Sequence, residues 1–479
     1  LKALRPRPGL YLYLRLLRPM ENSGGADPHP AVLSPGPSSE LAQVVSPASS
    51  QDRASILCEA TDAMLVELRG TALQSCLSGM GQIWEGSVEN QSYYARTMIR
   101  QRLDYFISHD WSTSRWVKLL TLAVYFNGTA AFCMSLAVSV VVFVLQVKGV
   151  LVQRMPPQVR LTAGVEYEEV SGVWSFPAGC LTFFFVLLYW QVCRERVLLP
   201  IYVFVDKACI NQWSPEEKKR GVYSIGGFLQ KSDRLLMLCT SRYFSRMWCA
   251  FEVAAWLRLR NVDSIIFLPP SDAVFTGLWF SLVLCAHGCI YIGTQFPGVP
   301  LAPFALLVVF CAPLPLTHSA RLVMRELLSL PELLRAHDVA ETQCFCCTHQ
   351  HVDPVTGSAL MCDRDIVYEA IDCWYGSDTP CPSHEKATVV RQSSHEASAA
   401  ERSAGTAHFN EVVQTKLSDA LEIMVARPVS YVSCLIAASP AIWWYLDQIT
   451  AMVLDGPHDP YLILKRSVRI FIVSFLLWP

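Results

Sequence analysis

Two long uncharged apolar stretches constrain the fold more than any other feature of this sequence. Residues 129–147 run for 19 positions without a charged side chain, and residues 173–193 form a second such run. A helix of roughly 20 apolar residues has the length needed to cross a bilayer. The chain is 52% hydrophobic and only 17% charged, which agrees with membrane segments. We therefore expect two membrane-spanning helices, joined as a hairpin over residues 127–196.

Further apolar runs predict a second hairpin in residues 271–318 and C-terminal membrane segments in residues 428–479. The final run contains Lys465 and Arg466, which are also compatible with a helix lying along the membrane surface. Basic residues gather at one end of each predicted span, as cytoplasmic loops require. They are Arg115, Lys118, Arg194, Arg196, Arg258, Arg260, Arg321, Arg325 and Arg427. We expect a multi-pass protein with the lipid bilayer as partner and its soluble parts in the cytoplasm.

The composition of the remaining segments sets the outer domain boundaries. Residues 1–52 are rich in Ser, Pro, Gly and Ala beyond Met20, which predicts a disordered N-terminal tail. Met20 is the expected start, so residues 1–19 are expected not to be native. Residues 53–98 predict a helical lead-in that begins with one amphipathic helix. Residues 319–427 predict a cytosolic Cys/His-rich region and linker, and the C-terminus is expected to be truncated.

Charge and cysteine usage exclude two classes of protein. The net charge is −2, whereas a nucleic-acid-binding protein needs a basic face. The 18 cysteines are spread along the chain and several fall in apolar runs. They therefore resemble small buried hydrophobic residues more than a disulfide framework.

Short apolar stretches alternate with amphipathic helices around and after the first hairpin. The predicted strands are residues 104–109, 201–206, 234–239 and 263–268. Helices are expected to begin near Arg115 and at Ser214-Pro215, where Glu217 completes a capping box. Apolar strands between amphipathic helices predict an α/β fold, a parallel sheet flanked by helices.

One predicted helix, residues 241–259, carries Trp248 and Glu252 four positions apart. This spacing places both side chains on one helical face. The helical neighbours of Glu252 are apolar and none is basic. An acid in such surroundings is either paired with a residue distant in sequence or used for chemistry.

Three stretches taken together resemble the TIR (Toll/interleukin-1 receptor) domain. They are FISHDW at 106–111, FVDKACINQ at 204–212 and SRYFSRMWCAFE at 241–252, and the ACINQ piece also resembles the related heterokaryon-incompatibility (HET) domain. The resemblance covers residues 99–126 plus 197–270 and implies a flavodoxin-like fold interrupted and followed by transmembrane helices. The family's usual Arg-Asp-Pro-Gly-like tip is replaced by residues 207–213.

The resemblance implies a site as well as a fold. Glu252 corresponds to the catalytic glutamate of NAD-cleaving TIR domains, where one carboxylate stabilises the oxocarbenium-like ribose as nicotinamide leaves. NAD is then the substrate and the activity that of an NAD+ nucleosidase. The residues expected to shape or border the nucleotide are Phe106, Ser108, Asp206, Trp213 and Trp248. The alternative is a distantly paired or exposed Glu252 with Trp248 in the core.

A second group of residues resembles a metal site. The sequence CFCCTHQH supplies Cys344, Cys346, Cys347, His349 and His351. Thiolates and imidazoles are the ligands that zinc prefers, so this segment is a candidate zinc site. The alternatives are a reduced cysteine-rich loop or lipid-modified cysteines.

Three functions fit these features. The first is a membrane-anchored TIR-like signalling protein that cleaves NAD. The second is a non-catalytic TIR/HET-like scaffold that associates with itself or with other TIR-like domains. The third is a transporter or channel with a regulatory α/β domain. The first five predicted spans lack a charged residue in their middle, which disfavours the third function. Nucleic acid is not an expected partner.

Overall fold

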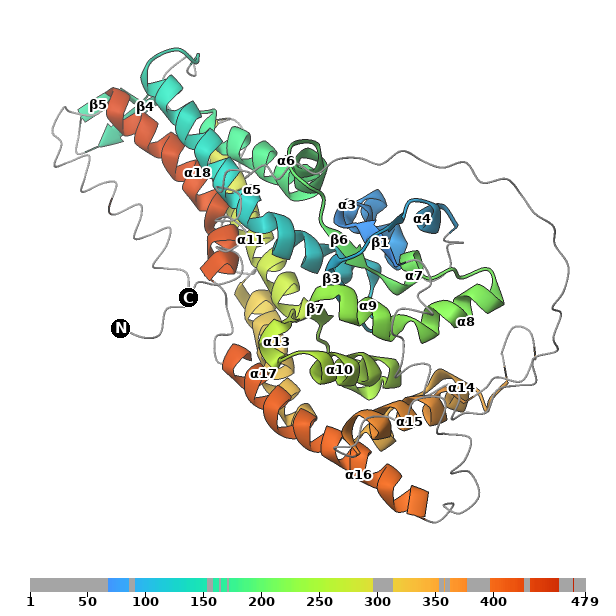
Figure 1. Ribbon diagram of the computed structural model, residues 1–479. Helices are drawn as coiled ribbons and strands as arrows, with labels where there is room; N and C mark the ends of the chain where they lie inside the picture. The colour runs from blue at the N-terminus through green and yellow to red at the C-terminus, as the bar shows by residue number, and fades with distance from the viewer. Residues whose placement is uncertain are drawn as a thin grey trace, which may run out of the picture. The chain divides into compact units, whose positions relative to one another are not determined.

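The computed structural model describes residues 68–85, 91–152, 158–162, 165–169, 172–295, 313–352, 357, 362–376, 397–425, 431–455 and 468 (Figure 1). The predicted N-terminal tail lies outside the described residues. So do most of the second member of the second hairpin, the last membrane segment apart from residue 468, and residues 377–396 of the linker.

A six-stranded mixed sheet lies at the centre of the α/β part, in the order β2-β1-β6-β3-β7-β8. Four strands run parallel to one another, namely β3 (Leu103–His109), β6 (Tyr202–Phe204), β7 (Ser232–Leu238) and β8 (Ile265–Phe267). These are the four strands that the apolar stretches predict. Their side chains are mostly buried, as expected for a sheet covered by helices on its faces.

The sheet gains two strands that the sequence did not predict. β1 (Arg69–Ala72) pairs antiparallel with both β6 and β2 (Met98–Ile99). The helical lead-in expected over residues 53–98 is therefore wrong at these positions. The described residues between the two strands form short helices, α3 (Leu73–Leu77), η1 (Gly79–Trp84) and α4 (Gln91–Ala95). The sheet is mixed rather than purely parallel.

The helix predicted at Ser214 begins there, but it is two helices. α8 (Pro215–Tyr223) and α9 (Ile225–Lys231) are separated at Ser224, and a short α7 (Asp206–Cys209) precedes them. The Ser214 hydroxyl accepts the backbone N–H of Glu217, as the N-cap predicts. In a full capping box the Glu217 side chain would also accept the backbone N–H of Ser214. Here the Glu217 carboxylate accepts from Asn211 instead.

The helix carrying Glu252 follows β7 as predicted. A 3-10 turn, η2 (Tyr243–Ser245), leads into α10 (Met247–Leu259), and η3 (Val262–Ser264) precedes β8. The described helices within residues 319–427, expected as a separate region, pack onto the same core as the sheet. The helices are α13 (Pro313–Arg335), η4 (Val339–Glu341), α14 (Phe345–Thr348), α15 (Asp363–Tyr375), α16 (Ala397–Val412), the π-helical η5 (Val413–Leu417) and α17 (Ser418–Val425).

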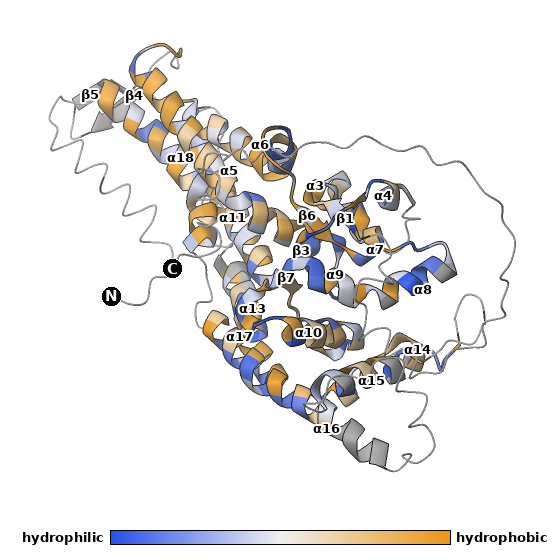
Figure 2. Cartoon of the chain, in the orientation of Figure 1, coloured by the Kyte–Doolittle hydropathy of each residue, from blue (hydrophilic) through white to orange (hydrophobic). Residues whose placement is uncertain are grey.

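Among the described residues, three helices are long and apolar enough to cross a membrane, α5 (Arg115–Val147), α6 (Ser175–Val197) and residues 270–293 of α11 (Pro270–Gln295). Apolar residues dominate along them in Figure 2. No break separates the predicted soluble helix from the predicted span at residue 127, because α5 is one helix of 33 residues. The loop between α5 and α6 contains an unpredicted hairpin, β4 (Gln158–Thr162) with β5 (Val165–Glu169).

The helix α18 (Tyr431–Asp455) packs against α5, α6 and α11. Phe183, Phe280 and Trp443 from three of these helices form a second apolar core. Asp447 lies inside α18 and is buried. Its carboxylate accepts the backbone N–H groups of Ser175 and Phe176, both at 2.9 Å. It thereby caps the N-terminus of α6.

Candidate functional site

The carboxyl end of β3 carries a run of polar residues, Ser108, His109 and Asp110, all of them buried. Asp206 and Lys207 follow the neighbouring parallel strand β6. Open parallel sheets bind ligands at this edge, outside the carboxyl ends of their strands. The fold therefore gathers residues from two of the three sequence motifs at the expected place.

Glu252 of α10 completes this group. The Ser108 hydroxyl donates a hydrogen bond to the Glu252 carboxyl group and lies within hydrogen-bonding distance of the Tyr243 hydroxyl. Burial raises the pKa of Glu252 to about 8, the hydrogen bond from Ser108 opposes that rise, and the charge of Asp206 adds to it. The acid is thus paired with a residue distant in sequence and is mostly neutral at pH 7.

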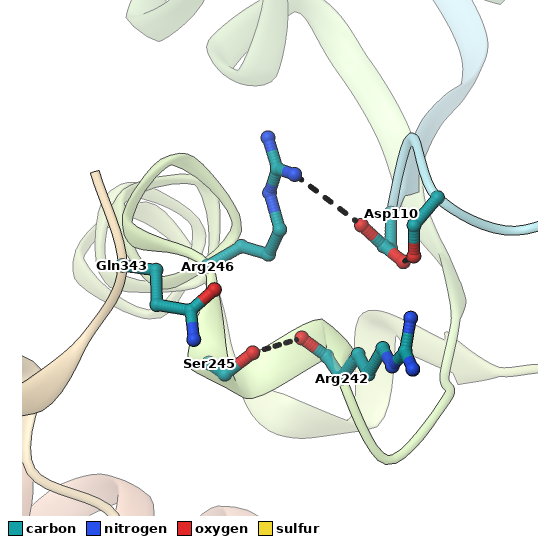
Figure 3. A pocket seen from close by; sticks show the side chains of 6 residues that line it. Asp110, Arg242, Ser245, Arg246 and Gln343 are labelled. Carbon is teal, nitrogen blue, oxygen red and sulfur yellow. Dashed lines mark hydrogen bonds and ion pairs between the residues drawn. The ribbon is translucent and has the colours of Figure 1, made fainter. Parts of the chain in front are cut away.

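A pocket of about 340 Å³ opens beside this group (Figure 3), at the N-terminus of α10. Its lining residues are Asp110, Ser112, Arg242, Ser245, Arg246 and Gln343. The Arg246 guanidinium forms an ion pair with Asp110 at 3.7 Å, and Asp110 is 1% exposed. Two arginines and a helix N-terminus suit an anionic group. Glu252 is not among the lining residues.

Two of the five predicted nucleotide-binding residues lie near Glu252, and these are Ser108 and Asp206. Asp206 accepts the indole N–H of Trp111 at 2.8 Å, so it also links the loops after β3 and β6.

The other three predicted residues have their contacts elsewhere. Phe106 is fully buried in the core and stacks on Phe204, with ring centres 4.4 Å apart. Trp248 turns away from Glu252 and donates its indole N–H to Asp363 at 3.3 Å. Trp213 packs edge-to-face against Tyr94 instead of lining the pocket.

Three basic residues at this edge were missed by sequence reasoning. Lys118 is 1% exposed, and its amino group has no hydrogen-bond partner in the described part of the chain. Lys207 reaches the Glu85 backbone carbonyl at 3.1 Å, and burial lowers the pKa of Lys207. Burial also lowers the pKa of His109 to about 4. The detectable signal was a titratable residue at or just beyond the carboxyl end of a predicted strand, as at His109 and Lys207.

The Cys/His segment forms a cluster that differs from the predicted one. Cys346, Cys347, His351 and Cys362 place their potential ligand atoms within 4.8 Å of one another. Cys344 belongs to a different group of three, with Cys346 and Asp363. His349 belongs to neither group. The predicted set of five therefore loses Cys344 and His349 and gains Cys362.

Comparison with known proteins adds no relative: no family model, no curated protein and no solved structure matches this chain.

Proposed function

We propose that the chain is a membrane-anchored signalling protein whose α/β part is a TIR-like domain. The observation that carries this proposal is the meeting of the three sequence motifs at one edge of the sheet. Ser108 from the first motif hydrogen-bonds Glu252 from the third, and Asp206 from the second lies near enough to influence its pKa. Motifs that are far apart in sequence but meet at one site support the assignment of all three to one TIR-like domain.

The strand order supports the same assignment. Among the four parallel strands, the order β6-β3-β7-β8 places the second strand of the chain at one edge, then the first, third and fourth. Flavodoxin-like sheets have this 2-1-3-4 order, and the TIR resemblance implies such a fold. Strands β1 and β2 extend that order at the edge next to β6.

Exposed apolar side chains support membrane anchoring. Leu181 and Phe185 on α6 are 73% and 56% exposed, and Val141 on α5 is 58% exposed. Such side chains are stable on a helix surface where lipid replaces water. Arg194 and Arg196 lie in the last turn of α6. In this proposal they mark the cytoplasmic side, on which the α/β domain lies.

Association with a second copy or with another TIR-like domain is the mode of action that the geometry supports best. Glu252 is hydrogen-bonded to Ser108 and is not among the residues that line the pocket. By contrast, Trp111 and Trp213 are 51% and 46% exposed on the loops after β3 and α7. Exposed tryptophans are typical anchors of protein interfaces.

NAD cleavage is the second candidate, and the arginine-lined pocket beside the sheet edge favours it. Arg242 and Arg246 suit a pyrophosphate. Nicotinamide would leave with the electrons of its C–N bond while water adds to the ribose carbon. Glu252 would have to lose its proton and turn from Ser108 to stabilise the developing positive charge.

The two candidates are separated by assays on the full chain in lipid nanodiscs. We expect the wild type to self-associate and Trp111→Ala/Trp213→Ala to associate at least tenfold more weakly. The control Trp116→Ala, another exposed tryptophan, should behave as wild type. NAD turnover that is lost in Glu252→Gln would establish the second candidate. Absence of self-association, of binding to TIR-like domains and of NAD turnover would refute the proposal.

A further inference from the structure

The cysteine cluster formed by α14 and the start of α15 has the composition of a zinc site. Cys346 and Cys347 lie in α14, His351 follows that helix, and Cys362 directly precedes α15. Their four potential ligand atoms lie within 4.8 Å of one another. We propose that Cys346, Cys347, His351 and Cys362 bind one zinc ion as a Cys3His structural site, independently of the function proposed above. Structural zinc sites take four such ligands in a tetrahedron.

The sulfur positions fit a metal better than a disulfide. The Sγ atoms of Cys347 and Cys362 are 3.8 Å apart. Two thiolates on a tetrahedral zinc, each with a Zn–S bond of about 2.3 Å, lie about 3.8 Å apart. A disulfide requires an S–S distance of about 2 Å. The spacing between these two residues, which come from different helices, is that of ligands sharing one ion.

The backbone is turned to bring the imidazole back to the cysteines. Gln350 and His351 have φ values of 53° and 60°, a left-handed conformation that residues other than glycine seldom adopt. The backbone N–H of His351 donates to the Cys346 carbonyl at 2.7 Å. Such strain persists where a surrounding constraint fixes it, and a shared metal ion is a constraint of that kind.

Backbone contacts hold two of the proposed sulfur ligands in place. The backbone N–H of Asp363 donates to the Cys346 sulfur at 3.3 Å, and contacts of this kind orient metal ligands. Cys362 is the N-cap residue of α15, a helix of 13 residues. The start of a regular helix thus fixes the backbone at this ligand.

The neighbouring residues of the same segment are placed differently. The Nδ1 atom of His349 is 3.0 Å from the Phe345 carbonyl, so this ring turns back along its own helix. Cys344 is buried with its sulfur 2.9 Å from that of Cys346, but its group offers only three ligands. His349 and Cys344 are therefore matched controls within the same eight-residue sequence.

The zinc site would also hold one wall of the pocket. Gln343, which lines the pocket, lies three positions before Cys346. Its backbone N–H donates to the Ser245 carbonyl at 2.7 Å, and its carbonyl accepts from Met247 at 3.2 Å. The ion would thus anchor the segment that follows this contact, through α14 and α15, against the N-terminus of α10.

Metal analysis of the full chain, purified in detergent without chelators, tests the site. We expect about one zinc per chain in the wild type. Cys347→Ser, Cys362→Ser and His351→Ala should each lower the bound zinc at least fivefold, whereas Cys344→Ser and His349→Ala should retain it. Loss of zinc from His349→Ala to the same extent as from His351→Ala would overturn the assignment.

X-ray absorption spectroscopy of the wild type tests the site without any variant. The expected zinc shell has three sulfur ligands at about 2.3 Å and one nitrogen at about 2.0 Å. A wild type without zinc, or a shell with any other set of ligands, would refute the proposal. Neither result affects the self-association and NAD assays, so the failure of one proposal is distinguishable from the failure of the other.

Discussion

The hydroxyl of Ser108, at the carboxyl end of β3, donates a hydrogen bond to the carboxyl group of Glu252 on α10, 144 positions later. This contact joins residues from the first and third of the three sequence motifs. Burial keeps the carboxyl group of Glu252 mostly protonated at neutral pH, and the hydrogen bond from Ser108 opposes that effect. A neutral Glu252 can act as a structural hydrogen-bond partner of Ser108, whereas NAD cleavage would require the ionised carboxylate.

The raised pKa of Glu252 predicts a pH-dependent stability. Unfolding returns Glu252 from a pKa of about 8 to its ordinary value of about 4.3. Between these values the unfolded chain ionises Glu252 while the folded protein keeps it protonated. The free energy of unfolding therefore falls as the pH rises from about 4 to about 8, by on the order of a few kcal/mol, and this contribution is flat above that range.

Glu252→Gln tests this prediction, because glutamine accepts the Ser108 hydrogen bond but does not ionise. The free energy of unfolding of the variant, relative to that of the wild type, should increase as the pH rises from 5 to 8. Chemical denaturation at each pH measures this difference. Glu411→Gln, at an exposed position of α16, is the control and should follow the wild type. Parallel curves for Glu252→Gln and wild type would contradict the prediction.

The ion pair between Arg246 and Asp110 predicts unequal roles for the two arginines of the pocket. Asp110 is almost fully buried, and Arg246 is its counter-charge at 3.7 Å. Arg246→Ala should destabilise the protein by about 1–3 kcal/mol, since it leaves a buried acid unpaired. Arg242 is exposed, so Arg242→Ala should change stability by less than about 0.5 kcal/mol.

Thermal unfolding measures both effects, and the double variant Arg246→Ala/Asp110→Asn should recover part of the loss because the unpaired charge is gone. Equal stabilities of Arg246→Ala and Arg242→Ala would show that the ion pair contributes nothing.

The sequence predicted the four parallel strands because their signal is local. Each is a short apolar stretch bounded by polar residues. The strand β1 escaped because its sequence is RGTA, which is short and contains glycine. The unbroken α5 escaped because Asn127-Gly128 suggests a helix end. Asn127 instead donates to the Leu187 carbonyl, and Gly128 provides the close approach of Ile436.

The candidate site was predictable in its centre but not in its periphery. Ser108, Asp206 and Glu252 follow from motifs at strand ends and on one helix. Trp248 was misassigned because its partner Asp363 lies 115 positions later. Cys362 was left out of the predicted zinc ligands because it lies outside the dense CFCCTHQH segment and joins the cluster only through folding.

Phe106 and Trp213 were both predicted to border a nucleotide. The structure predicts that truncating them destabilises the protein by very different amounts. Phe106→Ala should cost about 3–5 kcal/mol of stability, because a fully buried ring is deleted. Trp213→Ala should cost less than about 1 kcal/mol, since nearly half of that side chain is exposed. Denaturation midpoints of the two variants compare these losses directly. A Phe106→Ala protein as stable as Trp213→Ala would place Phe106 outside the core.

The contacts of Asp447 predict that its replacement destabilises the N-terminus of α6. Its two carboxylate oxygens accept the backbone N–H groups of Ser175 and Phe176, and Gln146 donates to it at 3.2 Å. Asp447→Ala removes the acceptor of the Ser175 and Phe176 backbone N–H groups, which costs about 1–3 kcal/mol for a donor. Asp447→Asn keeps one carbonyl oxygen and should lose less.

The measurement is thermal denaturation of the full chain in lipid nanodiscs, with proteolysis between α5 and α6 as a second readout. We expect the unfolding temperature to fall in the order wild type, Asp447→Asn, Asp447→Ala, and cleavage before Ser175 to rise in the same order. Asp272→Asn changes an acid in the first turn of α11; it controls for the loss of a charge and should leave this cleavage unchanged. Wild-type cleavage in Asp447→Ala would mean that the N-terminus of α6 is held by other contacts.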